Sequence, residues 1–406
     1  MNPRARLALL LTAGIFVSAA TTRTGSAEGR SRPDASAAQQ NAAAVPRLDG
    51  SKISADEIDA AAAKALATHK VTGVGIAVLV KGKIEFVKGY GFRDTEKKLP
   101  MTPNSVGTAA SLTKAAFAYL VMQLVQDGAI DLDQPVYQYL AKPLPEFPRY
   151  QDLAGDDRYK KITARMLLAH TSGFPNWRVL SDDKKLHIYF DPGSRFAYSG
   201  EGIDLLQLVV EAVTKHGMKE LMVERVFRPL GMTRTSMTWE RWFEDDFSNG
   251  YDETGKSLGR QRRDRADAAG SMQTTVADYA KFLQAVMNGT GLHPETREMM
   301  LSPQVRIRTL HEFPTLSAET TNQNDAIRLS YGLAWGLYWT PYGKVFFKEG
   351  HDYGWQNYAV AFDQKRMGML IMTNSDNGES MYDDLLRTIQ GNTFTPVEWE
   401  QFGKSN

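Results

Sequence analysis

The chain has 406 residues, of which 42% are hydrophobic, no cysteine, and a formal net charge of +1. This composition is typical of a globular protein with one large domain or two ordinary ones, and the near-neutral charge gives no reason to expect nucleic acid or an anionic membrane surface as a partner. A thiolate zinc site is excluded, and the seven histidines contain no HExxH pair, so we expect no metal and no other cofactor.

The first residues have the pattern of an export signal. Arg4 and Arg6 precede the apolar run Leu7–Ala20, which is shorter than the roughly 20 residues of a membrane span, and small residues follow it. We expect residues 1–27 to be a signal peptide, and the mature protein to be periplasmic or secreted, with no stable membrane span after cleavage. A short membrane anchor is the alternative. Residues 28–47 are rich in Ala, Ser, Arg and Gln, which predicts a disordered linker.

The remaining chain alternates between helical and strand patterns. Ser54 and Glu57 form a capping box that predicts a helix to about Lys70. Apolar spacing predicts further helices over 111–126, 203–215, 221–227, 276–287 and 379–390, and strands over 74–80, 83–90, 345–348, 355–362 and 367–373.

This order predicts an α+β fold over residues 48–395. Strands from both ends of the chain, 48–107 and 330–395, would form one antiparallel sheet flanked by the N- and C-terminal helices. Residues 108–329 would form a second, mostly helical lobe. A functional site is then expected in the cleft between the two lobes.

Ser111 and Lys114 are the first candidates for that site. Three residues apart, they lie one above the other on a helix face, and Ser111 stands at the helix start, where backbone N–H groups stabilise negative charge. A buried lysine has a lowered pKa and can take the serine proton. Ser-x-x-Lys alone is a weak signal, because serine often caps helices and lysine is usually solvated.

Two further segments can converge on this pair. Tyr198 precedes a helix and could act as a general base beside Lys114. Lys348, Gly350 and His351 lie at a strand end, where the glycine would let substrate lie along the strand. The backbone N–H groups of Ser111 and His351 could then form an oxyanion hole.

Together these motifs resemble the serine β-lactamase and penicillin-binding-protein superfamily, in particular its class C β-lactamase, D-aminopeptidase and esterase branch. The resemblance covers roughly residues 50 to 390 and includes the flanking segments Leu167–Gly173, Arg228–Met232, Ala269–Met272, Tyr331–Gly336 and Met372–Ser375. It implies that Ser111 is the nucleophile of an acyl-enzyme, that Lys114 and Tyr198 move protons, and that Lys348 supports Tyr198. Which group is the base stays open.

The sequence departs from the family pattern twice. Gly200 stands where the family's Tyr-x-Asn motif has an amide that contacts the lysine and the substrate. Glu349 follows Lys348 where related enzymes tend to carry Thr or Ser; if it faced the site it would repel a substrate carboxylate, and otherwise it would pair with a surface cation. Both changes favour an ester, or a substrate without the usual carboxylate.

We therefore expect an exported, cofactor-free serine hydrolase acting on small carboxylic esters or D-amino-acid amides. The alternatives are a β-lactamase or D-Ala-D-Ala carboxypeptidase, and a non-catalytic peptidoglycan- or peptide-binding protein on the same fold. The oligomeric state stays open. Gly255–Gly259 also matches a Gly-x-Ser-x-Gly nucleophile elbow, but its neighbours are polar rather than strand and helix.

Overall fold

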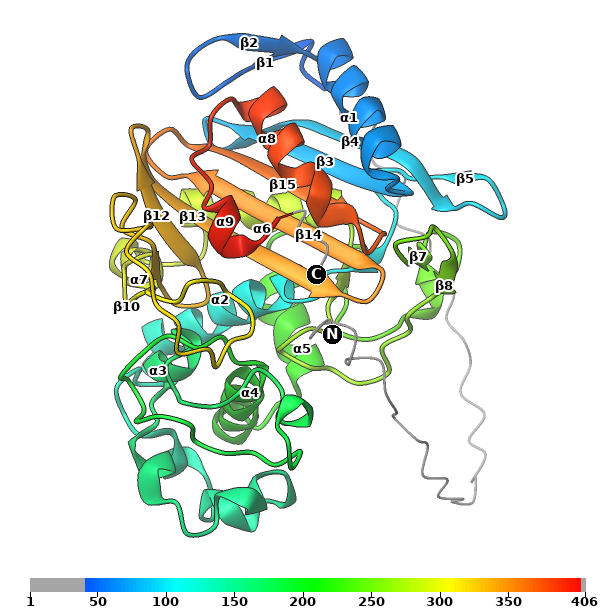
Figure 1. Ribbon diagram of the computed structural model, residues 1–406. Helices are drawn as coiled ribbons and strands as arrows, with labels where there is room; N and C mark the ends of the chain where they lie inside the picture. The colour runs from blue at the N-terminus through cyan, green and yellow to red at the C-terminus, as the bar shows by residue number, and fades with distance from the viewer. Residues whose placement is uncertain (1–40, 403–406) are drawn as a thin grey trace, which may run out of the picture. The chain divides into compact units, whose positions relative to one another are not determined.

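The computed structural model describes residues 41–402, and a nine-stranded antiparallel sheet is the centre of the fold (Figure 1). Along the sheet the strands follow the order β10 (Val305–Arg306), β11 (Ser330–Tyr331), β12 (Gly336–Thr340), β13 (Gly343–Asp352), β14 (Trp355–Phe362), β15 (Met367–Thr373), β3 (Gly73–Val80), β4 (Lys83–Asp94) and β5 (Leu99–Pro100). Strands from the two ends of the chain meet where β15 pairs with β3, with Ile371 opposite Ile76. The α+β expectation is therefore confirmed.

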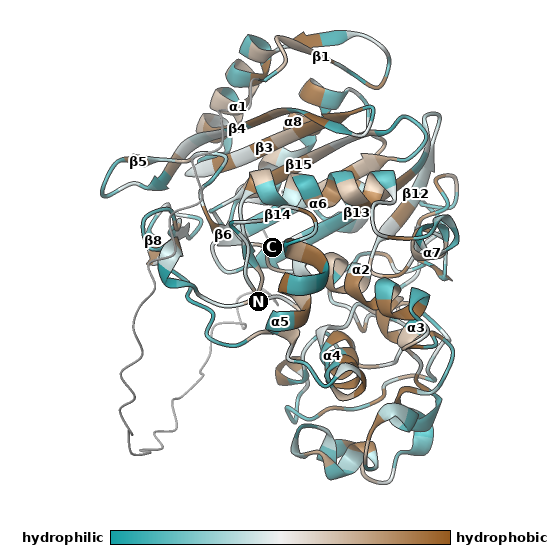
Figure 2. Cartoon of the chain, turned by 180° about the vertical axis from the view of Figure 1, so that it is seen from behind, coloured by the Kyte–Doolittle hydropathy of each residue, from teal (hydrophilic) through white to brown (hydrophobic). Residues whose placement is uncertain are grey.

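Helices cover both faces of the sheet, and successive side chains of one strand therefore point into two different hydrophobic cores. Ile76 and Val78 of β3 belong to the core under α1 (Ala55–His69) and α8 (Tyr382–Gln390). Ala77 and Leu79 belong to the core shared with α2 (Leu112–Gln126) and α6 (Val276–Asn288). The two terminal helices cross the near face in Figure 1, and α6 crosses the opposite face in Figure 2.

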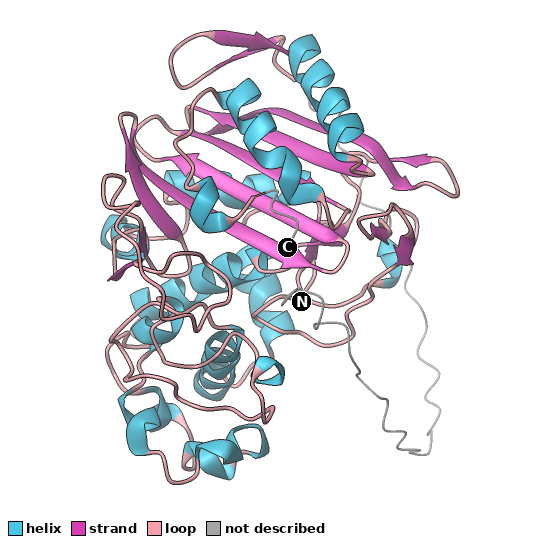
Figure 3. Cartoon of the chain, in the orientation of Figure 1, coloured by secondary structure: helices cyan, strands magenta, loops and turns pink. Residues whose placement is uncertain are grey.

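The position of α6 differs from the expected division of the chain. The sequence analysis assigned 108–329 to a helical lobe, but α6 packs on strands β3, β4, β14 and β15. Gly75 allows this contact, because a Cβ there would lie 2.8 Å from Cγ1 of Val276. The helical region beyond the sheet is built instead around α3 (Ala164–Leu168), α4 (Gly200–Thr214) and α5 (Met218–Met222), as Figure 3 shows.

Besides several 3₁₀ helices, the described chain contains further short strands and α-helices. They are β1 (Ala44–Pro46), β2 (Lys52–Ser54), β6 (Gly107–Thr108), β7 (Gly250–Tyr251), β8 (Ser257–Gly259), β9 (Gln273–Thr274), α7 (Pro294–Met300) and α9 (Val397–Glu400). Strand β1 pairs with β2 and buries Val45, so residues 44–46 form regular structure within the range 28–47 that the sequence assigned to a linker. The predicted signal peptide lies outside the described residues. Between residues 41 and 402, no helix is long and apolar enough to cross a membrane.

Local signals in the sequence explain where the main helices begin. Ser54 caps α1 as predicted: its hydroxyl accepts from the Glu57 N–H, and the Glu57 carboxylate accepts from the Ser54 N–H. Thr275 caps α6 in the same way, by accepting from the Asp278 N–H. The expected strands are present with equal or longer bounds, and most expected helices agree within a few residues. The helix expected over 379–390 begins as a 3₁₀ turn and becomes α8 at Tyr382, and the helix expected over 221–227 is α5 followed by a π-helical turn over Val223–Phe227.

Candidate active site

Ser111 lies in a sharp turn between β6 and α2. The preceding Ala110 has a φ of 49°, in the left-handed region that residues other than glycine rarely adopt. Ser111 itself is the N-cap residue of α2, and its hydroxyl makes no capping bond to the helix. The side chain is therefore free of the structural role that serine usually has at a helix start, and it is only partly buried.

Two features of the sheet bring β13 next to this turn. Gly350 has no Cβ, and a Cβ there would lie 2.6 Å from the carbonyl oxygen of Ala109 and 3.0 Å from the amide nitrogen of Leu112. From β14, the buried Asn357 amide donates to the carbonyls of Thr108 (3.0 Å) and Ala109 (3.3 Å). Contact between strand and helix start thus depends on a glycine that the sequence analysis identified and an asparagine that it missed.

Lys114 is completely buried and points at Ser111. Its Nζ donates to Ser111 Oγ over 2.9 Å and to the carbonyl oxygen of Ala269 over 2.6 Å. Burial, reinforced by the positive charge of Lys348, lowers the pKa of Lys114 to about 7. A substantial fraction of Lys114 is consequently neutral near pH 7 and able to accept the serine proton.

Tyr198 and Lys348 complete a chain of polar contacts around the serine. Nζ of Lys348 donates to Tyr198 Oη over 3.1 Å, and both side chains are buried. Burial raises the pKa of the Tyr198 hydroxyl, although Lys348 and a hydrogen bond with Ser111 act in the opposite direction. Tyr198 therefore stays protonated near neutral pH, and Lys114 is the better placed of the two to act as the base.

The Glu349 side chain adopts neither of the two arrangements that the sequence analysis considered. It neither presents a free charge to substrate nor pairs with a surface cation: its carboxylate forms an ion pair with the buried Nζ of Lys348. Burial disfavours the charged form of both groups, but Lys348 lowers the pKa of Glu349 and Glu349 raises that of Lys348, so both groups stay charged. Because the pair has no net charge, the expectation that Glu349 repels a carboxylate substrate loses its basis.

His170 contacts the candidate tyrosine rather than the serine. Its ring centroid lies 4.3 Å from that of Tyr198, and its Nδ1 accepts from the Ser199 N–H over 3.2 Å. Burial, with Lys348 and Lys114 nearby, keeps the pKa of His170 well below its ordinary value, so the ring is neutral. The neutral ring packs against Tyr198 with the two ring planes tilted by 41°, and so helps to orient the phenol.

Gly200 and His351 belong to elements already described around Ser111, and Ser257 lies on a separate hairpin. Gly200 is the first residue of α4, directly after the cap residue Ser199. It lies against the ring of Trp177, whose centroid is 5.8 Å from the Nζ of Lys114. His351 follows Gly350 on β13, and its Nε2 lies 2.6 Å from Oε1 of Glu379. Ser257, in the elbow-like motif, lies on hairpin strand β8 with no helix after it. Among residues 41–402 no group of three or more His, Cys, Asp or Glu side chains could hold a metal ion.

Known proteins are similar to most of this chain. A family model described as Beta-lactamase matches residues 58–391. Protein flp of Staphylococcus aureus (strain NCTC 8325 / PS 47) is 28% identical over 219 residues, which cover 50% of this chain and 42% of flp. The match thus spans less than half of flp. Penicillin-binding protein 4* of Bacillus subtilis (strain 168) is 23% identical over 360 residues, covering 79% of this chain and 72% of the relative.

Solved structures share the fold. The octameric penicillin-binding protein homologue from Pyrococcus abyssi superposes with a TM-score of 0.65 and 22% identity, covering 82% of this chain and 76% of the other. D-alanine carboxypeptidase AmpC from Burkholderia cenocepacia superposes with a TM-score of 0.65 and 20% identity, covering 82% and 97%. At this level of identity the similarity establishes the fold alone.

Proposed function

Since the chain belongs to the beta-lactamase family of serine hydrolases, we propose that it hydrolyses small carboxylic esters or D-amino-acid amides through an acyl-enzyme on Ser111. One observation carries the proposal. The Nζ of the buried Lys114, with a pKa of about 7, lies 2.9 Å from Ser111 Oγ. Such a contact serves no evident structural purpose, but it suits a nucleophile and its base.

The contacts around Ser111 support a two-step acyl transfer. Neutral Lys114 takes the Ser111 proton as Oγ attacks the substrate carbonyl, and the backbone N–H groups of Ser111 and His351 stabilise the oxyanion. Collapse of the tetrahedral intermediate expels the alcohol or amine, which takes a proton from Lys114 directly or through Tyr198. Water then attacks the acyl carbonyl and gives one proton to neutral Lys114, which passes that proton to Ser111 Oγ as the carboxylic acid leaves.

Two other functions remain to be compared with this one. A β-lactamase or D-Ala-D-Ala carboxypeptidase would use the same nucleophile, and one protein with a similar fold is the D-alanine carboxypeptidase AmpC from Burkholderia cenocepacia. A binding protein on the same fold would hold peptidoglycan or peptide without turnover. The uncharged Lys348–Glu349 pair removes one reason to disfavour carboxylate substrates, so the distinction between ester and β-lactam rests on the acyl pocket.

Covalent labelling tests the proposal. A fluorescent fluorophosphonate should label purified wild-type protein, and Ser111→Ala should abolish both labelling and turnover of p-nitrophenyl esters. Ser257→Ala is the matched control. This serine lies on strand β8, and its replacement should change neither the labelling nor the ester turnover. Labelling that persists in Ser111→Ala, or that disappears in Ser257→Ala, would exclude Ser111 as the nucleophile. An unlabelled wild type would favour the binding protein, and faster turnover of nitrocefin than of short esters would favour the β-lactamase.

We also propose that the enzyme works outside the cytoplasm, as a periplasmic or secreted protein. The basic residues Arg4 and Arg6 and the apolar run Leu7–Ala20 support this proposal. Expression of the full chain in a bacterial host with an epitope tag, followed by fractionation, tests it. A mature form shortened by about 20–30 residues is expected outside the cytoplasm, and full-length cytoplasmic protein would contradict export.

A further inference from the structure

The start of α4 lacks the side chain that would normally face the lysine, and an aromatic ring fills the space. A Cβ on Gly200 would lie 2.5, 2.7 and 2.8 Å from three carbons of the Trp177 ring. No side chain at position 200 fits beside this ring without moving it. The position of the Trp177 ring therefore depends on the glycine. The sequence alone indicated only that an amide side chain is absent at position 200.

The Trp177 ring lies close to the reacting groups. Its centroid is 5.8 Å from the Nζ of Lys114, and that Nζ is 2.9 Å from Ser111 Oγ. Trp177 is only partly buried and packs against the core through part of its surface. An acyl group carried by Ser111 on the side of Lys114 would therefore meet an indole face instead of an amide.

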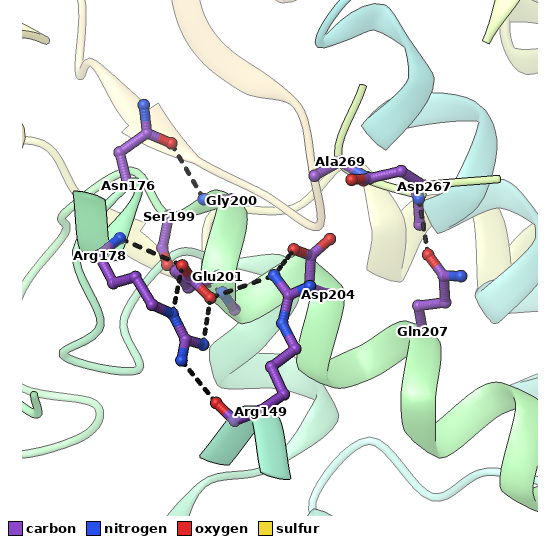
Figure 4. Close-up of polar contacts among 12 residues, drawn as sticks. Arg149, Asn176, Arg178, Ser199, Gly200, Glu201, Asp204, Gln207, Asp267 and Ala269 are labelled. Atoms are coloured by element: carbon purple, nitrogen blue, oxygen red, sulfur yellow. Dashed lines mark hydrogen bonds and ion pairs between the residues drawn. The ribbon is translucent and has the colours of Figure 1, made fainter. Parts of the chain in front are cut away.

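Contacts of both chain neighbours hold Trp177 in this place (Figure 4). On one side, the side-chain Oδ1 of Asn176 accepts from the Gly200 N–H over 3.0 Å, as Figure 4 shows. The backbone carbonyl of Asn176 also accepts from the N–H groups of Gly200 (3.0 Å) and Glu201 (3.1 Å). On the other, Arg178 donates to the buried Glu201 carboxylate through its backbone N–H, Nε and Nη2, at 3.1, 2.9 and 2.7 Å.

A second arginine, Arg149, contacts the same residues at the start of α4. Arg149 forms ion pairs with Asp204 and, at 3.3 Å, with Glu201, and its carbonyl accepts from Arg178. These multiple charge-assisted bonds on buried carboxylates fix the loop around Trp177 to the first turn of α4. The ring is thus a rigid wall and not a mobile cover.

We propose that Trp177, admitted by Gly200, is the specificity-determining residue of the acyl pocket and selects acyl groups with an apolar chain over acyl groups that carry an amide next to the reacting carbonyl. The inference rests on the proposed hydrolase function and names its substrate class. An aliphatic chain gains by leaving water for the ring, about fourfold for each methylene that does so. An amide in the same place loses its hydrogen bonds to water and meets no donor from residue 200.

Competing esters of matched length test the inference. The two substrates are the p-nitrophenyl esters of pentanoic acid and of N-acetylglycine, and the readout is the ratio of their kcat/KM values. Each kcat/KM is first divided by the rate of hydroxide hydrolysis of that ester. The wild type should prefer pentanoate by about tenfold or more, the gain expected from two methylenes. A corrected ratio of one or below in the wild type would overturn the inference.

Substitutions assign the preference to the ring. Trp177→Ala should lower the ratio about tenfold, whereas Trp177→Phe, which keeps an aromatic face without an N–H, should keep it within about threefold. Trp177→Ala combined with Gly200→Asn should lower it further, because the amide then has both room and a partner. Trp242→Ala, an exposed tryptophan that is 47% accessible, is the control and should leave the ratio unchanged.

Each result bears on one hypothesis. A ratio unaffected by Trp177→Ala would remove Trp177 from the acyl pocket. A ratio lowered equally by Trp177→Phe and Trp177→Ala would mean that the indole N–H binds substrate, which also overturns the apolar wall. Because a ratio does not depend on the fraction of active protein, reduced folding of a variant does not obscure it. Failure of fluorophosphonate to label the wild type would instead remove the proposed function itself.

Discussion

Replacing Glu349 with glutamine removes one buried negative charge while keeping the size of the side chain. In the wild type this charge neutralises Lys348, whose own positive charge lowers the pKa of Lys114. After Glu349→Gln the charge of Lys348 is uncompensated, so it should disfavour protonation of Lys114 more strongly. The pKa of Lys114 should therefore fall.

The structure sets a minimum for this shift. The Nζ atoms of Lys114 and Lys348 lie 5.1 and 4.6 Å from the centroid of the Tyr198 ring, so they are separated by at most about 10 Å. The Glu349 carboxylate contacts Lys348, and is within about 13 Å of Lys114. At an effective dielectric constant of about 20, one charge at that distance contributes about 1.3 kcal/mol, close to one pKa unit.

The assay is kcat/KM for an uncharged p-nitrophenyl ester between pH 5 and 9. Lys114 acts as a base only when neutral, so wild-type kcat/KM should rise with pH through a midpoint of about 7. In Glu349→Gln this midpoint should move to about 6 or below. The charged groups that shift the pKa of Lys114 are Lys348, which lowers it, and Asp267, Asp204 and Glu349, which raise it.

Controls separate this effect from damage to the fold. Leaving the buried Lys348 unpaired should cost about 3–5 kcal/mol of stability, measured by denaturant unfolding, but the midpoint of a pH profile does not depend on the amount of folded enzyme. Asp59→Asn on α1 removes a partner of Lys88 and should leave the midpoint unchanged. A midpoint that stays at about 7 or rises in Glu349→Gln would refute the reasoning, because Lys348 would then have lost its proton or Lys114 would not be the base.

Three further substitutions have expected outcomes. Tyr198→Phe should slow acylation about 10²- to 10⁴-fold in stopped-flow assays with little change in substrate binding; wild-type turnover of an unactivated ester would leave Tyr198 as a packing residue. Gly350→Ala should lower kcat/KM about 10- to 100-fold, since the new Cβ would lie 2.6 Å from the Ala109 carbonyl and displace β13 from Ser111; unchanged kinetics would show that the turn can move freely. Ser54→Ala should reduce the free energy of unfolding by about 1 kcal/mol through loss of the α1 cap and leave turnover unchanged; an equal loss of activity would link α1 to the site.

Structural features that depend on residues close together in the sequence were predicted well. The cap of α1 by Ser54 and Glu57 agrees with the structure because capping uses residues three apart. Strands β3, β14 and β15 were expected almost as they occur, since alternation and β-branched residues act locally. Ser111 and Lys114 come together for the same reason, through one turn of α2.

Contacts between distant segments were beyond such patterns. Asn357 holds the Ser111 turn across about 250 residues of chain, and an asparagine inside an apolar strand carries no mark of that partner. The same limit applies to α6, whose apolar stripe indicates a buried face and not which surface covers it. Its packing on the sheet therefore had to come from the structure.

By itself, the sequence determined the α+β order of elements, the candidate nucleophile and its lysine one helical turn apart, and the resemblance to the family, because spacing along a helix or strand dictates which side chains share a face. Only the tertiary structure decided the electrostatics and the shape of the site. It paired Glu349 with Lys348 and placed Trp177 over Gly200. The pKa of Lys114 and the space beside it depend on charges and rings contributed by other segments, which become neighbours only when the sheet and α4 close around Ser111.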